Sequence, residues 1–122
     1  MTDQDLTNNV ALLSPFAGQT VKFFIPNAIE NQFALMRQLT DLLKRAEWNI
    51  LGIDTFLVVG GEPSYGVRIR ANSVSPALEA IARATIRLLG KENVVAGTTP
   101  ADSPLDGDHI QIIIWPKAPK PE

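Results

Sequence analysis

Residues 20–30 read TVKFFIPNAIE, and this stretch decides the fold that the sequence predicts. Its apolar run, Val21–Ile25, has the length and composition of a β-strand, and a proline follows it directly. Asn27 is a preferred helix N-cap residue, and Glu30 stands three residues later, in the spacing of a capping box. We therefore expect a strand that leads straight into a helix, which is the opening half of a βαβ unit.

The same order of signals returns in residues 66–76, GVRIRANSVSP. In the first six of these residues, apolar side chains alternate with Arg68 and Arg70, which predicts a strand with one buried face and one face that is wet or paired. Ser75 followed by Pro76 is a strong helix start, because serine caps free N–H groups and proline fits the first helical position. We expect the sheet to be organised around these two strand-to-helix turns.

Apolar spacing and turn residues place the other elements around these two turns. The predicted fold is α/β, with a mostly parallel sheet of about five strands, two or three layers, two main helices, and the order β-α-β-β-α-β-β after a short N-terminal helix. The expected helices span residues 3–13, 28–47 and 76–89, and the expected strands span residues 21–25, 48–53, 66–71, 93–96 and 109–115. Residues 55–59 are compatible with a further strand, and residues 60–64 with a turn.

Length and composition fit one domain over residues 1–122. The chain is 45% hydrophobic and 20% charged, which is enough apolar material for one core. Residues 1–13 form the N-terminal helix of this expected domain, and residues 116–122 form a loose proline-rich tail. The residues that we expect to be largely buried are Phe23, Ile25, Leu39, Leu42, Ile69, Ile81, Leu88 and Ile113.

Charge and cysteine content narrow the classes of function. The net charge is −2 and no basic block occurs, so we expect no nucleic-acid partner. The absence of cysteine excludes disulfides, thiolate zinc sites and a cysteine nucleophile. No run approaches the ~20 apolar residues of a membrane span, so we expect no direct membrane insertion by this chain. Residues 1–9 lack the basic and apolar regions of a signal peptide, and the chain as given is expected to be soluble.

Polar residues follow the expected strands where a ligand site is predicted. If the strands at 21–25 and 66–71 are parallel neighbours with right-handed crossovers, both helix starts lie at one edge of the sheet. Ligands of α/β proteins bind at the carboxyl ends of parallel strands, where free helix N–H groups hold anions such as phosphate or carboxylate. The candidate ligand-binding residues at this edge are Asn27, Asn72, Ser73, Ser75, Thr98, Thr99 and Asp102. The alternative is structural, with Asn27 and Ser75 capping their own helices and the other residues satisfying loop backbone.

No complete catalytic or metal-binding set is predicted. The Gly-Gly pair at residues 60–61 lacks the order of a dinucleotide motif and the lysine of a phosphate loop. His109 is the only histidine and has no nucleophile beside it, so we expect a solvated strand-end histidine rather than an acid or base. The three aspartates in residues 102–108 lack the distal glutamate of a calcium loop. We therefore expect no metal and no cofactor.

Trp48 and Trp115 border expected strands. Packing in the core or at a sheet edge explains both residues, and the alternative is that an exposed tryptophan anchors a partner.

Four segments together resemble a known group of proteins: LSPFAGQ at residues 13–19, LKRAEW at 43–48, GVRI at 66–69 and IQIIIWPK at 110–117. The pattern over residues 13–117 resembles the soluble C-terminal α/β domain of uncharacterised bacterial proteins with N-terminal transmembrane helices. The resemblance implies a membrane-tethered parent protein, and it carries over no functional residue.

These observations favour a non-catalytic binding or interaction module in a membrane-associated bacterial protein. Its expected partner is another protein or a second copy of the chain. The alternative is a domain that binds a small ligand, a nucleotide or another anion at the edge where the helices start. An enzyme ranks third, because no motif specifies a chemistry.

Overall fold

The structure is a computed structural model that describes residues 3–26, 30–56, 66–99 and 109–115, together with Asp102, Leu105 and Gly107. Its helices are α1 (Asp3–Leu13), α2 (Glu30–Arg45) and α3 (Pro76–Leu89), with short 3-10 helices at Ser14–Phe16 and Lys91–Asn93. Its strands are β1 (Thr20–Pro26), β2 (Asn49–Phe56), β3 (Val67–Ala71), β4 (Val94–Thr98) and β5 (Ile110–Ile114). Most of the segment at 55–64 and the tail at 116–122 lie outside the described residues.

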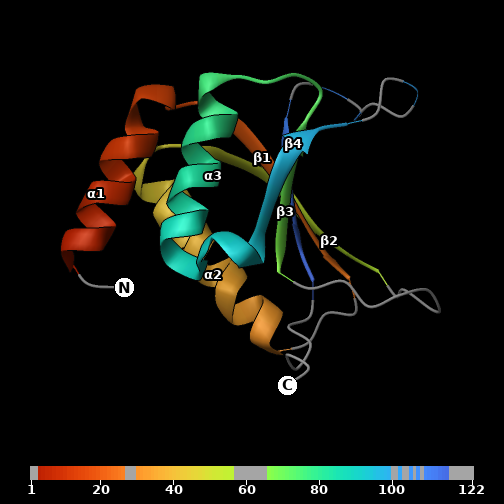
Figure 1. The fold of residues 1–122 in the computed structure, drawn as a ribbon, viewed down its shortest axis with the longest axis horizontal. Helices are drawn as coiled ribbons and strands as arrows, with labels where there is room; N and C mark the ends of the chain where they lie inside the picture. The colour runs from red at the N-terminus through yellow and green to blue at the C-terminus, as the bar shows by residue number, and fades with distance from the viewer. Residues whose placement is uncertain are drawn as a thin grey trace.

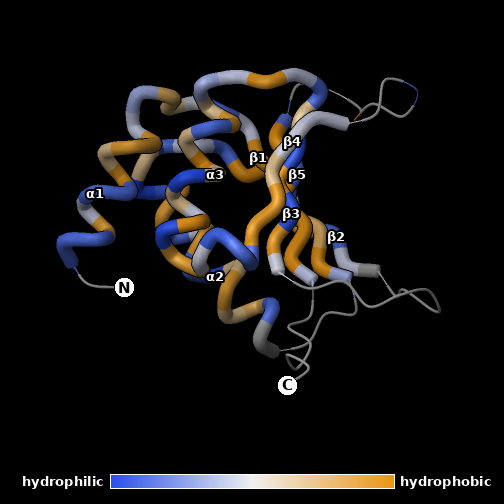
Figure 2. The backbone as a smooth tube through the Cα atoms, viewed as in Figure 1, coloured by the Kyte–Doolittle hydropathy of each residue, from blue (hydrophilic) through white to orange (hydrophobic). Residues whose placement is uncertain are grey.

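The described helices all lie on one side of the sheet (Figure 1). Helices α2 and α3 pack against one face of the five-stranded sheet, and α1 packs against α2 and α3 on their side away from the strands, which confirms the α/β class. Figure 2 shows hydrophobic and hydrophilic stretches alternating along the helices, as expected for helices with one buried stripe. The apolar stripes of α2 and α3 therefore pack on the sheet, and the apolar side of α1 packs on these two helices.

The sheet has the strand order β2-β1-β5-β3-β4, and it is mostly parallel. Strand β1 pairs in parallel with β2 and β5, and β3 pairs in parallel with β4, whereas β3 and β5 are antiparallel. The condition for a shared helix-start edge, that β1 and β3 are parallel neighbours, is therefore not met, because β5 lies between them and they run in opposite directions. All five residues of β5 are buried, and so apolar a strand is most stable in the centre of a sheet, with both of its faces covered.

Alternating side chains of the strands build the core. In β1, Val21, Phe23 and Ile25 are fully buried, and the residues between them are partly exposed. Every predicted core residue is buried except Leu88, which packs against the core while partly exposed. His109, which was expected in solvent, is only 8% exposed, because β5 enters the centre of the sheet and not its edge.

Helix α2 ends in a turn that uses an unusual backbone conformation. The N–H of Trp48 donates to the carbonyl of Leu43 (2.9 Å), and the N–H of Glu47 donates to the carbonyl of Lys44 (3.0 Å), which is the pattern of a Schellman motif. Glu47 has a φ of 64°, in the left-handed region where glycine is usual. Trp48 is buried, and its Nε1 donates to the carbonyl of Leu13 (2.9 Å), so this turn also fixes the end of α1.

Helix α3 has the two ends that the sequence predicts, with one difference. The Ser75 hydroxyl accepts a hydrogen bond from the N–H of Leu78 (3.1 Å), and Pro76 takes the first helical position. Gly90 ends the helix with a φ of 93°. Its ψ of 148° is extended, so this helix end differs from the left-handed helical cap that is usual for a glycine at the end of a helix.

Candidate binding surfaces

The shared helix-start edge predicted from the sequence does not form. Because β1 and β3 run in opposite directions on the two sides of β5, their carboxyl ends lie at opposite edges of the sheet. Helix α2 therefore starts at one edge and α3 at the other. Asn27 itself lies outside the described residues, and it follows the strand end at the first of these edges. The other six candidate residues follow β3 or β4, or lie at the end of β4, at the second edge.

At the second edge, Asn72 is a hydrogen-bonding centre for the connection between β4 and β5. Its Nδ2 donates to the carbonyls of Leu105 (3.1 Å) and Gly107 (3.2 Å). Its Oδ1 accepts from the N–H of Leu105 (2.7 Å) and from the hydroxyl of Thr99 (3.0 Å). The amide of Asn72 is thus engaged on both atoms, which agrees with the structural alternative for this residue.

The remaining candidates at this edge are a helix cap and solvent-exposed residues. Ser75 uses its hydroxyl to cap α3. Ser73, Thr98 and Asp102 are exposed to solvent. The observed roles of Asn72 and Ser75 are therefore to hold a loop and a helix start.

The first edge is occupied by a residue that the sequence reasoning missed. Gln32, in the first turns of α2, is 1% exposed, and its Nε2 donates to the carbonyls of Ile114 (2.8 Å) and Pro26. Gln32 thus links the end of β1 to the end of β5 through one backbone carbonyl of each strand. A signal existed, because Gln32 stands seven residues before Leu39 and so lies on the apolar stripe of α2.

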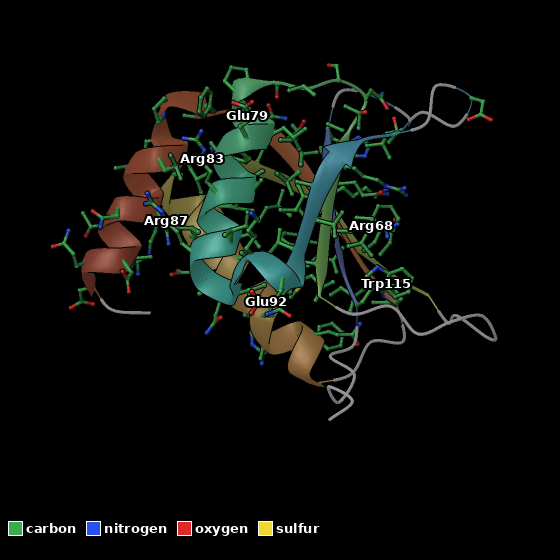
Figure 3. The ribbon with its side chains drawn as sticks, viewed as in Figure 1. Arg68, Glu79, Arg83, Arg87, Glu92 and Trp115 are labelled. Atoms are coloured by element: carbon green, nitrogen blue, oxygen red, sulfur yellow. The ribbon has the colours of Figure 1, made fainter. Side chains whose placement is uncertain are left out.

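A second candidate surface is the side of the sheet opposite the helices, which we call the outer face. The strand register places these side chains and Cα positions on it: Lys22 and Phe24 of β1, Asp54 of β2, Gln111 and Ile113 of β5, Arg68 and Arg70 of β3, and Val95 and Gly97 of β4. Figure 3 shows Arg68 and Trp115 projecting from this side of the sheet. No described helix covers the outer face.

Most cations of the outer face are held by neighbours within that face. Lys22 forms an ion pair with Asp54 (Nζ to Oδ2, 3.1 Å), and its ammonium lies 5.4 Å from the centroid of the Phe24 ring. The Nε of Arg70 donates to Oε1 of Gln111 (2.5 Å). These contacts fix two of the three cations in place, so the face is a preorganised mixture of cationic, aromatic and aliphatic groups.

Arg68 differs from the other two cations. It is exposed, and it makes no hydrogen bond or ion pair within the described part of the chain. It lies opposite Ile113 on one side and Val95 on the other, so its guanidinium stands among apolar neighbours. Nε1 of Trp115 is buried and has no hydrogen-bond acceptor among the described residues.

The helical layer contains a third feature, a polar pocket between α1 and α3. Its volume is about 510 Å³, and it is lined by Asp5, Asn8, Asn9, Arg87 and Leu88. Figure 3 shows Arg83 and Arg87 on the side of α3 that faces α1. The carboxylate of Asp5 and the amides of Asn8 and Asn9 come from α1, and the guanidinium of Arg87 comes from α3.

Among the described residues, no three His, Asp or Glu side chains gather in a group that could hold a metal ion. No described helix has the length and hydropathy to cross a membrane. Comparison with family models, with curated proteins and with solved structures found no match to this chain.

Proposed function

We propose that this chain is a non-catalytic interaction module that binds a protein partner on the outer face of its sheet. The observation that carries the proposal is Arg68, an exposed guanidinium without a partner in the described structure, at a position between Ile113 and Val95. Arginine and aromatic residues that stand among aliphatic side chains are typical of the residues that dominate protein–protein binding. Lys22 and Arg70 support the proposal, because their contacts hold them ready on the same face.

The alternative from the sequence, an anion or nucleotide site at a shared helix-start edge, has lost its geometric basis. The two helix starts lie at opposite edges of the sheet. At the start of α3, Ser75 and Asn72 are engaged with backbone groups of their own chain. We therefore favour the outer face over this edge.

The proposal retains a membrane-associated bacterial parent protein, and its support is the resemblance of residues 13–117 alone. The test is fractionation of the native protein with an antibody raised against this domain. Recovery in the membrane fraction after a carbonate wash is the expected result. Recovery only in the wash supernatant would contradict the tether.

The binding proposal is tested with peptides selected from a random display library against the folded chain. We expect the selected peptides to shift the backbone amide resonances of β3, β4 and β5 in the isotope-labelled protein. Arg68→Gln should weaken the binding of these peptides about tenfold, because one hydrogen bond to a charged group changes a binding constant by about that factor. The matched control is Arg83→Gln, which removes the same charge from α3 on the other layer. Peptides that bind both variants equally and shift α1 and α3 instead would refute the outer face.

A further inference from the structure

No described strand pairs with the outer edge of β4. β4 is the terminal strand of the sheet, and four of its five residues are exposed. In a parallel pair, alternate residues point their N–H and C=O groups to opposite sides of the strand. The N–H of Thr99 donates to the carbonyl of Ala71 in β3 (2.9 Å). The backbone N–H and C=O groups of Val95 and Gly97 therefore also point toward β3, and those of Ala96 and Thr98 point away from it, toward the open side of β4.

The side chains next to this edge give it a charge preference. The register places Val95 beside Arg68 and Gly97 beside Arg70 on the outer face. Val95 is 60% exposed, and no atom lies within 4 Å of the position that a Cβ would take on Gly97. Gly97 therefore leaves room on the outer face, beside Arg70, for a side chain of an added strand.

We propose that an extended acidic segment of a protein partner adds to the outer edge of β4 as a further strand. Its backbone would pair with the outward groups of Ala96 and Thr98, and its alternate carboxylates would lie on the outer face and reach Arg68 and Arg70. Neighbouring strands are about 4.8 Å apart, so the added strand lies about 10 Å from β3, which long arginine and glutamate side chains span together. This inference rests on the proposed function and names the partner class.

Charge complementarity selects this occupant over a second copy of the chain. A β4–β4 pair between two copies would bring only the residues VVAGT to the edge, and none of them is acidic. Arg68 would then remain without a counter-charge. A nucleic acid would satisfy the cations but has no peptide groups to pair with the outward N–H and C=O groups of Ala96 and Thr98.

The first test uses a labelled peptide of four threonine–glutamate repeats, in which every glutamate falls on one face of a strand. Peptides of threonine–glutamine and threonine–lysine repeats are the controls, and binding is followed by fluorescence anisotropy. We expect the glutamate peptide to bind about tenfold more tightly than the glutamine peptide, and Arg68→Gln to remove most of this difference. Arg83→Gln should leave it unchanged. Equal binding of the glutamate and glutamine peptides, or tighter binding of an oligothymidylate, would overturn the acidic segment.

The second test asks whether the backbone of β4 takes part. On addition of the glutamate peptide, hydrogen exchange should slow at the amides of Ala96 and Thr98 and change little at Val95 and Gly97, which already bond to β3. Ala96→Pro removes an outward N–H without removing a bond to β3, and it should abolish binding while the fold is retained. Peptide binding with unchanged exchange at Ala96 and Thr98 would overturn strand addition and leave the proposed function standing. Failure of all peptides, with library peptides selected onto α1 and α3, would overturn both.

Discussion

Replacing Glu47 by glycine should stabilise the protein, although glycine usually weakens structure. Glu47 is the C′ residue of the Schellman motif at the end of α2, and its φ of 64° brings its Cβ close to the following carbonyl oxygen. Its side chain is exposed, so its removal uncovers no core. The substitution therefore acts on the backbone alone.

Two opposing terms set the magnitude. Relief of the left-handed conformation is worth about 1–2 kcal/mol for an L-residue. The added freedom of glycine in the unfolded chain costs about 0.5–1 kcal/mol. The mid values of these two terms give an expected net gain for Glu47→Gly of about 0.75 kcal/mol, which raises the melting temperature of a chain of this size by roughly 2–5 °C.

The assay is urea unfolding followed by the fluorescence of buried Trp48, with circular dichroism as a second probe. Glu47→Ala is the matched control, because it removes the carboxylate and keeps the Cβ that causes the strain. It should stay within about 0.5 kcal/mol of the wild type. If the glycine variant is no more stable than the alanine variant, the conformation of Glu47 is not strained and the reasoning fails.

Four further measurements address the core, the cap of α3, the link between the ends of β1 and β5, and the absence of a structural metal. Leu39→Ala removes a fully buried side chain and should cost about 2–5 kcal/mol in urea unfolding, and a cost below about 0.5 kcal/mol would place the wrong face of α2 in the core. Ser75→Ala removes the cap of α3 and should cost about 1 kcal/mol, whereas Ser75→Asp should restore most of it. Gln32→Met leaves the carbonyls of Ile114 and Pro26 without this donor and should cost about 1–3 kcal/mol, with retention of full stability as the contrary result. Chelator treatment should leave the melting temperature unchanged, and a drop that added metal reverses would show a structural ion.

Local signals were sufficient wherever a neighbouring residue decides the structure. The Ser75-Pro76 pair predicts the start of α3, and the alternation around Arg68 and Arg70 predicts β3 with its wet face. Both depend on contacts within a few residues along the chain. The period of a strand and the cap of a helix could therefore be predicted from the sequence.

Strand order could not be predicted in the same way, because it depends on contacts between distant segments. The apolar run of β5 agrees with its burial along its whole length, but it does not say which strands flank β5 or in which direction they run. The position of β5 between β1 and β3, with β3 antiparallel to it, places the two helix starts at opposite edges of the sheet. The role of Asn72 was equally hidden, because its partners Leu105 and Gly107 lie more than thirty positions away.

The cationic outer face could not be predicted from the sequence either. Lys22 is separated from Arg68 and Arg70 by most of the first half of the chain, so no basic block marks them. Pairing through β5 brings them to one side of the sheet. A scan for clustered charge sees only neighbours in sequence, whereas a sheet gathers charges from several strands.

The central place of β5 has a consequence for synthesis on the ribosome. The β1–β2 pair and then the β3–β4 pair leave the exit tunnel before β5, and each half of the sheet then carries an unpaired inner edge, on β1 and on β3. Only when β5 emerges, as the last strand in chain order, can one segment seal both edges at once. Until that moment the nascent chain exposes two templates for aggregation, so its folding should depend on holdase chaperones and on translation speed through the final strand.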